Sequence, residues 1–551
     1  MNFLRLNDYL LTILFQDSEI IALDKPYGLT SHTNDSKVGN EDFIHEGLIE
    51  IYEKQLGQRL YIVHRLDQTT TGVIIFAKTP EAAKKYAAFF FDRKVKKTYL
   101  FITAKKSIKT EFNIDQPIIH KGKELTAQTD FSLIKKTSTF QLWQARPLTG
   151  RNHQIRIHAQ AGDISILGDA KYGGDAFAFL CLHNRRIEFP NGIVIESQPP
   201  MYFEDLNLIE NFMLVKILFD IDRRQRLFGQ FSASKECFRL VHQKSDERNT
   251  GVTLDQLGEN WVLYSYHNNL SESDQKTFQQ LSKIFNKPLL IRFRPEGKSV
   301  VGHPVAPVLP SAGAALQNSW MAEENKIKYE LRMDAGQSFG LFVDQRLQRY
   351  WVLKNSSDKK VLNLFSYTGG FSLAAALGKA KEVTSVDTNK NVLAWSKKNF
   401  ELNQLDLSHY KFLCRDSLEF LEQNIKKNST FDLIICDPPA FSRGEKAIFK
   451  IETHLEKLLK GCLLCLSAEG TLLFSTHFEG FFIDDIRRTI EKLKIDLKLK
   501  HLQISLIQSG LDFELIGKKT ILKSFMITKK QEEEPLALVT QCTTDLLTEE
   551  D

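Results

Sequence analysis

Between about residues 331 and 530, short apolar runs alternate strictly with segments of helical pattern. The apolar runs are VLNLF, EVTSV, KFLC, DLIIC and TLLFS, and a helical stretch follows each of them. Strands that alternate with helices along a chain pair in parallel, and helices then cover both faces of the sheet. This region therefore predicts a Rossmann-like α/β domain.

The remainder of the 551 residues must form further domains, because one hydrophobic core cannot grow to this size. Residues 1–208 hold the strand-like runs EIIAL, GVIIFA, TYLFIT and TFQLWQA, which predict a mixed, largely antiparallel α+β domain. A helix is expected to start after Thr79, at Pro80. Residues 209–330 predict a smaller α+β domain, with CFRLV and NWVLYSYH as strands and GHPVAPVLPSAGA as a connecting loop.

The C-terminal segment 531–551 carries seven acids and no Lys or Arg, which predicts a disordered tail. Its negative charge also offsets part of the net positive charge of the rest of the chain. Without those seven of the 68 acids, the 73 bases are in excess by 12. A basic excess of this size favours a polyanionic partner such as RNA.

Cysteine usage and hydropathy indicate the compartment. Seven cysteines in a chain of this length make no disulfide framework, and no run approaches the roughly 18 apolar residues of a membrane span. Cys462 and Cys465 form a CxxC, but no second pair stands at zinc-like spacing, so buried helix positions are the better interpretation and no metal is expected. We expect a cytoplasmic protein.

A cluster of polar residues, HRLDQTTTG, precedes the apolar run VIIFA. His64, Arg65 and Asp67 therefore stand at the entrance of a buried strand, where a cleft can form. By chemistry alone, a structural Arg–Asp pair in a turn explains the cluster as well as a catalytic site does.

The segment HRLDQTTTG resembles the catalytic signature of the RluA-type pseudouridine synthases. The resemblance extends over most of residues 15–205, through ALDKPYGLTSH, KKTYLFI, PLTGRNHQIRIHAQAGDISILGDAKYGG and LCLHNRRIEF. Thr71 stands where the family usually has Ser, and Asn152 where it has Thr. The small RNA-binding domain that often precedes this catalytic domain has no room here.

The resemblance implies an isomerisation of uridine to pseudouridine, which needs no cofactor. Asp67 would act on the ribose as nucleophile or base, and Arg156 would stabilise its charge. Tyr99 would lie against the uracil and help to remove the carbon-5 proton. Arg65 would fill the space that a flipped uridine leaves, and His64 and Arg151 would also contact the RNA.

A second cluster lies in the α/β region, where VLNLFSYTGGFSLAA reads as a strand, a glycine turn and a helix. Asp387, Asp416 and Asp437 each follow an apolar run of this region. Ligands bind at the carboxyl ends of parallel strands, and an acid after the second strand commonly binds ribose hydroxyls. The turn Asp437-Pro438-Pro439-Ala440-Phe441 is similar to that of methyltransferases acting on planar nitrogens, although Asp-Pro-Pro alone is also simply a rigid turn.

Residues 237–527 resemble a 23S ribosomal RNA methyltransferase family, through RLVHQKSDERNTGVTLDQLGENWVL, FGLFVDQR, FSYTGGFS and DPPAF. The resemblance implies S-adenosylmethionine as cofactor and Asp437 as a catalytic residue that also contacts the cofactor. It implies Arg346 and Phe441 as RNA contacts. The other expected cofactor contacts are Asn363, Phe365, Ser366, Gly369, Gly370, Asp387, Asp416 and Pro438.

The acceptor atom can be narrowed from cysteine placement. Methylation of carbon 5 of a pyrimidine requires a Cys nucleophile, yet the loops DPPAFSRGEK and STHFEGF contain none. Cys436 precedes Asp437 inside a strand, so its side chain should point to the opposite face. A nitrogen acceptor is favoured, and the loops look most like the guanine N7 branch.

The sequence thus predicts a bifunctional enzyme that forms pseudouridine and methylates a base nitrogen, with 23S ribosomal RNA or a large-subunit assembly intermediate as its partner. No stable protein partner is implied. One alternative is that a single domain is catalytic while the other serves as an RNA-binding module. Another is methylation of a protein or a small molecule, which the basic balance disfavours.

Overall fold

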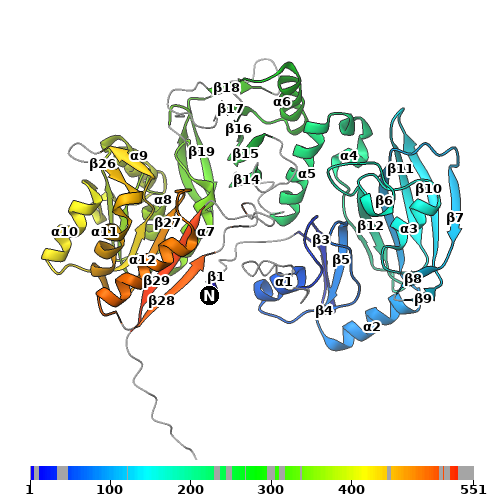
Figure 1. Cartoon of the computed structure of the whole chain (residues 1–551), viewed down its shortest axis with the longest axis horizontal. Coiled ribbons are helices and arrows are strands. Elements are labelled where there is room, and N and C mark those ends of the chain that lie inside the picture. The colour runs from blue at the N-terminus through cyan, green and yellow to red at the C-terminus, as the bar shows by residue number, and fades with distance from the viewer. Residues whose placement is uncertain are drawn as a thin grey trace, which may run out of the picture. The chain divides into compact units, whose positions relative to one another are not determined.

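The computed structural model describes residues 2–4, 12–33, 47–120, 122–228, 236–242, 251–266, 269–293, 305–309, 317–335, 338–443, 448–499, 501–507, 510, 513 and 522–530 (Figure 1). They fall into two compact units. The N-terminal unit comprises Asn7–Leu347 and Ser509–Thr520, and the C-terminal unit comprises Met1–Leu6, Gln348–Gln508 and Ile521–Asp551. The acidic segment 531–551, predicted to be disordered, lies outside the described residues.

A large mixed sheet forms the first part of the N-terminal unit. Its strand order is β2-β3-β5-β12-β6-β11-β10-β7, with β4 attached to β5 and β13 to β12. Neighbours pair in antiparallel fashion except β5 and β12, which are parallel. This confirms the mixed, largely antiparallel fold. The strands are β2 Ile13–Gln16, β3 Ile20–Lys25, β4 Tyr61–Ile62, β5 Thr71–Ala77, β6 Lys96–Thr103, β7 Glu111–Asp115, β10 Gln128–Lys136, β11 Gln141–Pro147, β12 Leu182–Glu188 and β13 Val194–Glu196.

Three helices and a small hairpin accompany this sheet. Helix α2, Pro80–Phe91, begins where the sequence predicts, and the Thr79 hydroxyl accepts a hydrogen bond from the Ala82 amide at 3.1 Å. It buries Ala82 and Tyr86 against the sheet. Helices α1, Leu48–Leu56, and α3, Gln154–Ala161, flank the loops that carry the site, and the hairpin consists of β8 Ile118–His120 and β9 Lys123–Leu125.

A second, five-stranded sheet in the N-terminal unit has the order β14-β15-β16-β17-β18. Its strands are β14 Cys237–Val241, β15 Val252–Leu257, β16 Asn260–Ser265, β17 Leu289–Phe293 and β18 Val305–Val308. Helix α6, Glu272–Phe285, packs beside them, and the hairpin of β19 Ser319–Glu324 and β20 Ile327–Arg332 follows. The predicted connecting loop is wrong in part, since β18 lies within it and pairs with β17. Pro307 is tolerated there because β18 is an edge strand.

Helix α5, Phe212–Leu227, lies in the same hydrophobic cluster as residues of both sheets. Its Phe219 stacks on Phe179 with ring centroids 3.9 Å apart. Leu254 of β15 belongs to the same cluster, which the short helix α4, Met201–Glu204, also lines with Tyr202 and Phe203. The core is therefore continuous from the large sheet through α5 to the second sheet.

The C-terminal unit is a Rossmann-like sheet of order β1-β28-β29-β27-β24-β21-β22-β23. The strands are β1 Asn2–Leu4, β21 Lys360–Leu364, β22 Glu382–Asp387, β23 Tyr410–Cys414, β24 Phe431–Cys436, β27 Leu466–Thr476, β28 Leu502–Ile507 and β29 Lys523–Lys529. The five predicted strands β21 to β24 and β27 are parallel, as expected, while β29 is antiparallel to both of its neighbours.

Helices alternate with these strands as predicted. They are α7 Arg346–Asn355, α8 Gly370–Leu377, α9 Lys390–Leu402, α10 Ser417–Lys426, α11 Ile451–Leu464 and α12 Ile483–Asp496, and a short hairpin of β25 Phe441–Arg443 and β26 Ile448–Lys450 precedes α11. Cys462 lies on α11 and Cys465 caps it, both fully buried. Among the described residues, no group of side chains could hold a metal ion and no helix could cross a membrane.

Candidate active sites

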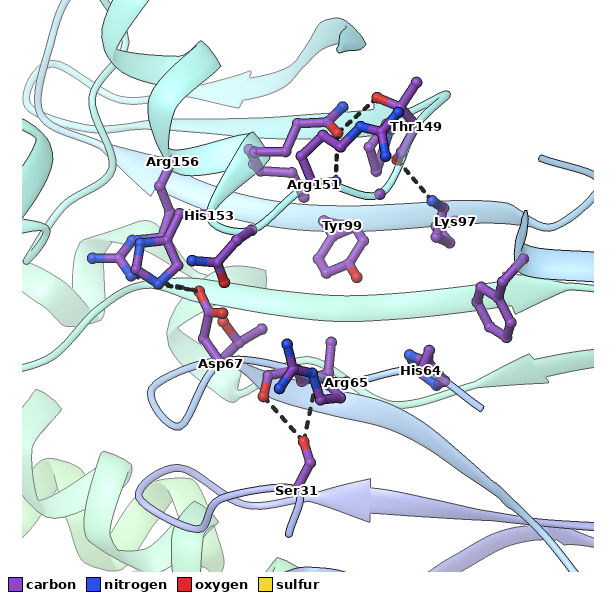
Figure 2. Close-up of a pocket in the computed structure, with 18 of the residues that line it drawn as sticks. Ser31, His64, Arg65, Asp67, Lys97, Tyr99, Thr149, Arg151, His153 and Arg156 are labelled. Atoms are coloured by element: carbon purple, nitrogen blue, oxygen red, sulfur yellow. Dashed lines mark hydrogen bonds and ion pairs between the residues drawn. The ribbon is translucent and has the colours of Figure 1, made fainter. Parts of the chain in front are cut away.

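A cavity of about 950 Å³ opens in the N-terminal unit beside β5 and β6. Its walls come from the loop before β5, the end of α2, strand β6 and the loop between β11 and α3. Figure 2 shows Arg65, His64 and Asp67 on one wall, Lys97 and Arg151 on the other, and Tyr99 between them.

Asp67 and Arg156, which the sequence paired, meet in this cavity. Nη1 of Arg156 lies 3.5 Å from Oδ2 of Asp67. The same guanidinium makes a two-point ion pair with Asp169, from Nε and Nη2, with both distances 2.7 Å. A bidentate pair of this kind fixes the plane of the guanidinium. Asp169, a fully buried side chain that the sequence prediction missed, therefore holds Arg156 toward Asp67.

His153 and Tyr172 form a second support for Asp67 that the sequence prediction also missed. Nε2 of His153 lies 3.7 Å from Oδ2 of Asp67, and its Nδ1 lies 2.9 Å from the Tyr172 hydroxyl. Burial lowers the pKa of His153, so the ring is neutral at neutral pH. The Tyr172 ring also lies under the Arg156 guanidinium at 5.0 Å, a cation–π contact.

Tyr99 lies on β6, which runs along the floor of the cavity. Burial, together with the nearby Asp67 carboxylate, raises the pKa of its hydroxyl, so the phenol stays protonated at neutral pH. A protonated tyrosine ring on the floor offers both an apolar face for a planar base and a hydrogen-bond donor or acceptor at its tip.

Lys25 anchors the loop that carries Asp67. Its ammonium donates to the carbonyls of Pro26, Gln68 and Thr70 at 3.1, 3.0 and 2.8 Å. Burial lowers the pKa of this amine to about 7, although the Asp67 carboxylate opposes the shift. Because three carbonyls use all three ammonium donors, Lys25 ties the backbone that follows Asp67 to the end of β3.

His64 is held in the wall of the cavity, whereas Arg65 is exposed to solvent. Nε2 of His64 accepts a hydrogen bond from the Ile75 amide at 3.0 Å, and the His64 ring stacks on the Phe90 ring. The His64 ring therefore forms part of the cavity wall. Burial lowers the pKa of His64 to about 3. Arg65, in contrast, is exposed and lines the cavity, as a residue that enters a vacated base position must be.

Five cationic side chains line the cavity: Arg65, Arg93, Lys97, Arg151 and Arg156. The only acid among the lining residues is Asp67. Nζ of Lys97 donates to the Thr149 carbonyl at 2.9 Å, and burial lowers its pKa to about 8. A cavity with this charge balance attracts a polyanion.

In the C-terminal unit, the strand register brings the predicted residues to one edge. Leu364 pairs with Val386 and with Cys436, and Asp387 pairs with Cys414. The residues that follow these positions, Phe365, Asp416 and Asp437, therefore share the carboxyl edge of the sheet with Asp387, where ligands bind in open parallel sheets.

The glycine turn after β21 packs closely against α9 and leaves one of its buried polar atoms unpaired among the described residues. Phe365, Tyr367 and Gly369 all have left-handed backbone conformations, with φ of 54°, 48° and 81°. A Cβ on Gly369 would lie 2.0 Å from Oγ of Ser396, so only glycine fits there. Oγ of Ser366 is buried without a hydrogen-bond partner among the described residues, which suits a polar ligand. Gly370 is the first residue of α8.

Two of the three acids already bind backbone amides. Asp387 accepts from the amides of Tyr367 and Asn389, both at 2.9 Å, and burial raises its pKa. Oδ1 of Asp416 accepts from Leu418 and Glu419 and so caps α10. A carboxylate has about four acceptor positions, so both acids shape the turns and retain capacity for a ligand.

The Asp437-Pro438 turn follows β24 directly, and the exposed Phe441 begins β25. Cys436 is fully buried in the cluster that contains Cys462 and Leu458. Burial raises the pKa of this thiol, which keeps it from acting as a nucleophile.

Two predicted residues, one cofactor contact and one RNA contact, are buried in contacts within their own units. The Asn363 side chain is buried inside β21 and donates to the Ser372 hydroxyl at 2.9 Å. Arg346 belongs to the N-terminal unit, where it is buried with its guanidinium 5.1 Å from the Phe228 ring. The sequence could not show these contacts. A matching motif identifies a residue by its place in the chain and does not show what its side chain contacts.

Comparison with known proteins yields a separate match for each unit's site. Residues 19–161 match the family described as RNA pseudouridylate synthase, and residues 306–485 match the S-adenosylmethionine-dependent methyltransferase family. The chain is 38% identical over 217 residues to ribosomal RNA large subunit methyltransferase K/L of Pseudoalteromonas translucida, covering 39% of this chain and 29% of the relative. It is 36% identical over 171 residues to ribosomal RNA large subunit methyltransferase K of Neisseria meningitidis, covering 31% and 48%.

Solved structures give matches of the same two kinds. Human RNA pseudouridylate synthase domain containing 4 is 26% identical, with 35% of this chain and 90% of that chain covered and a TM-score of 0.30. A SAM-dependent methyltransferase from Agrobacterium tumefaciens is 22% identical, with 51% and 87% covered and a TM-score of 0.40. The chain spans less than half the length of the two curated relatives named above.

Proposed function

Because the chain carries an RNA pseudouridylate synthase domain followed by an S-adenosylmethionine-dependent methyltransferase domain, we propose that it is a bifunctional RNA-modifying enzyme. It isomerises uridine to pseudouridine and methylates a base nitrogen, with guanine N7 as the acceptor. The boundaries proposed from the sequence are 1–208 for the synthase domain, 209–330 for the middle domain and 331–530 for the methyltransferase domain. The observation that carries the first activity is the contact of Arg156 with Asp67 in a cationic cavity.

In the synthase site, the target uridine enters the cavity with its uracil against Tyr99 and its ribose near Asp67. Asp67 acts on the ribose as nucleophile or base while the bond to nitrogen 1 breaks, the uracil turns, and a bond to carbon 5 forms. The proton on carbon 5 is then lost to solvent and nitrogen 1 gains a proton, while Tyr99, whose phenol stays protonated, supports the uracil with its ring and hydroxyl. The guanidinium of Arg156 lies beside the Asp67 carboxylate and would stabilise its negative charge in a cleft from which the base excludes water.

The methyltransferase site fits S-adenosylmethionine on one structural ground, the buried Oγ of Ser366, which has no hydrogen-bond partner among the described residues. Phe365, Ser366, Gly369, Gly370, Asp387, Asp416, Asp437 and Pro438 would hold the cofactor. When bound, it supplies an electrophilic methyl group. Asp387 would accept hydrogen bonds from the ribose hydroxyls of the cofactor. Asp437 would orient the target base by accepting a hydrogen bond from its amine, and the ring of Phe441 would stack on that base.

A nitrogen acceptor is supported by the position of Cys436, which is buried on the core face of β24. Methylation of carbon 5 requires a thiolate that reaches carbon 6 of the base, and a thiol in this core cluster cannot supply it. Incubation with RNA that contains 5-fluorocytidine tests this point. A covalent complex of enzyme and RNA would contradict the nitrogen assignment.

The substrate that we propose is 23S ribosomal RNA or a large-subunit assembly intermediate, because the relatives in the methyltransferase comparison are named for large-subunit ribosomal RNA. A cytoplasmic location accords with that substrate. Mass spectrometry of nucleosides mapped on this RNA, from a strain that lacks the gene and from its parent, tests the whole proposal. Loss of one pseudouridine and one 7-methylguanosine is expected, and unchanged modification at every position would refute it.

A further inference from the structure

The turn that ends α2 carries two side chains for which the proposed chemistry has no use. Phe91, the last residue of α2, exposes 88% of its surface, and Arg93 follows in a left-handed conformation with φ of 59°. Both line the same cavity as Asp67 and Tyr99. An exposed aromatic ring on the rim of a cationic cavity contributes little to the core, and its face is available for stacking with a base that enters the cavity.

Arg93 and Arg151 both place their guanidinium groups against Thr126. Nη2 of Arg93 lies 3.5 Å from the Thr126 hydroxyl, and Nε of Arg151 donates to the Thr126 carbonyl at 3.1 Å. Two elements distant in the sequence thus bring two permanent cations to one residue. No acid other than Asp67 lines the cavity, so their mutual repulsion favours an anion between them.

We propose that Phe91, Arg93 and Arg151 form a subsite for the nucleotide next to the target uridine, in a single-stranded segment of RNA. The base of that nucleotide stacks on Phe91, and its phosphate binds Arg93 and Arg151. This inference rests on the proposed pseudouridine synthesis, whose reacting uridine occupies the neighbouring space at Tyr99.

A single-stranded segment is the chemistry that this arrangement recognises. Stacking on an aromatic side chain requires an unpaired base with a free face, whereas a base inside a helix is already covered on both faces. Because every base has a stacking face, the subsite selects an open loop or strand and not a particular base. Loss of such a stack weakens binding by about 5- to 100-fold.

The test is a double-substitution cycle on the full chain. The probe is a fluorescein-labelled single-stranded undecanucleotide with one central uridine, and its two partners carry an abasic ribose immediately 5′ or 3′ of that uridine. Affinities are measured by anisotropy for the native chain, for Phe91→Ala and for Phe91→Trp. Ile108→Ala is the matched control, because Ile108 is 98% exposed and does not line the cavity.

We expect Phe91→Ala to weaken binding of the intact probe by about 5- to 100-fold and to leave binding of one abasic probe unchanged, while Phe91→Trp and Ile108→Ala bind normally. Arg93→Gln should reduce the dependence of log affinity on log salt by about one phosphate contact. An equal loss on all three probes, no loss on any of them, or no measurable binding of the probe to the native chain would overturn the subsite. Failure of the native chain to form pseudouridine would instead refute the proposed function, whatever the binding cycle shows.

Discussion

Nη1 of Arg156 lies 3.5 Å from Oδ2 of Asp67, a contact between residues that are 89 positions apart in the sequence. The carboxylate therefore has a fixed cation beside it, while its other neighbour, His153, is neutral. Asp67 is also the one acid that lines the cavity, which gives the first prediction.

Asp67→Asn should abolish pseudouridine formation, because an amide is neither a nucleophile nor a base at the ribose. Methylation by the same protein should persist, since Asp67 belongs to the N-terminal unit and the cofactor residues to the C-terminal unit. Tritium release from carbon 5 of labelled uridine measures the first activity, and methyl transfer from labelled cofactor the second. Substantial pseudouridine from the purified Asn variant would contradict the assignment of Asp67.

Asp169→Asn should slow pseudouridine formation by about 100-fold, because a guanidinium freed from its two-point partner loses its orientation toward Asp67. The effect should fall on kcat and leave KM for RNA nearly unchanged. Asp130→Asn, at an exposed acid of β10, is the control. Thermal melting separates this effect from a loss of folding, and a full-rate Asn variant with normal stability would refute the role.

The lowered pKa of Lys97 leads us to expect that RNA binding depends on pH. Burial lowers its pKa to about 8, so the amine is cationic below that pH and neutral above it. Affinity for RNA should therefore fall, by roughly tenfold at most, as the pH rises from 7 to 9. Lys97→Arg should flatten this profile because arginine does not lose its charge. His64 and Tyr99 titrate outside this range, and any contribution of Lys25 is common to both proteins. Identical profiles for lysine and arginine would exclude Lys97 as a phosphate contact.

The fold and the paired catalytic residues could be predicted because each depends on a local pattern. Alternation of strands and helices fixes the parallel sheet, and the segments around Asp67, Tyr99 and Arg156 were recognisable from their motifs. Thr79 caps α2 as a local rule requires.

The supporting residues could not be predicted, because their roles depend on contacts that no local pattern encodes. Lys25 and Asp169 act only through the carbonyls and the guanidinium that the fold brings to them. The cation pair at Thr126 likewise joins the end of α2 to the loop before α3. Strand β18 was missed because it lies in the segment GHPVAPVLPSAGA, whose prolines and glycines are typical of a loop, and Pro307 fits the strand because β18 is at the sheet edge.

Asp387 should contribute to the affinity for S-adenosylmethionine and to the shape of the glycine turn. Asp387→Ala should weaken binding by about 1.5–3 kcal/mol for each ribose hydroxyl lost, and it also leaves the amides of Tyr367 and Asn389 without their acceptor. Asp387→Asn keeps one acceptor oxygen and should lose less. Calorimetry on both variants, with the exposed Asp406→Asn as control, measures the difference. Unchanged affinity in the Ala variant would place the ribose elsewhere.

The contacts of α5 predict that the synthase domain ends after this helix and not before it. The boundary proposed from the sequence, at residue 208, separates α5 from the synthase domain. Yet Phe219 of α5 stacks on Phe179, and Arg226 bonds the Gln198 carbonyl at 2.7 Å and contacts Asp24 at the end of β3. A fragment of residues 1–208 leaves this apolar surface and the Asp24 carboxylate uncovered, whereas a fragment of residues 1–235 retains α5.

We therefore expect the shorter fragment to be less stable by at least about 3 kcal/mol, the usual cost of removing one buried aromatic side chain. Urea unfolding of the two purified fragments, monitored by tryptophan fluorescence from the buried Trp143, measures the difference directly. Phe219→Ala in the longer fragment should account for much of it, because its ring contributes the stacked contact. Equal stability of the two fragments would instead establish residue 208 as the domain boundary and assign α5 to the middle domain alone.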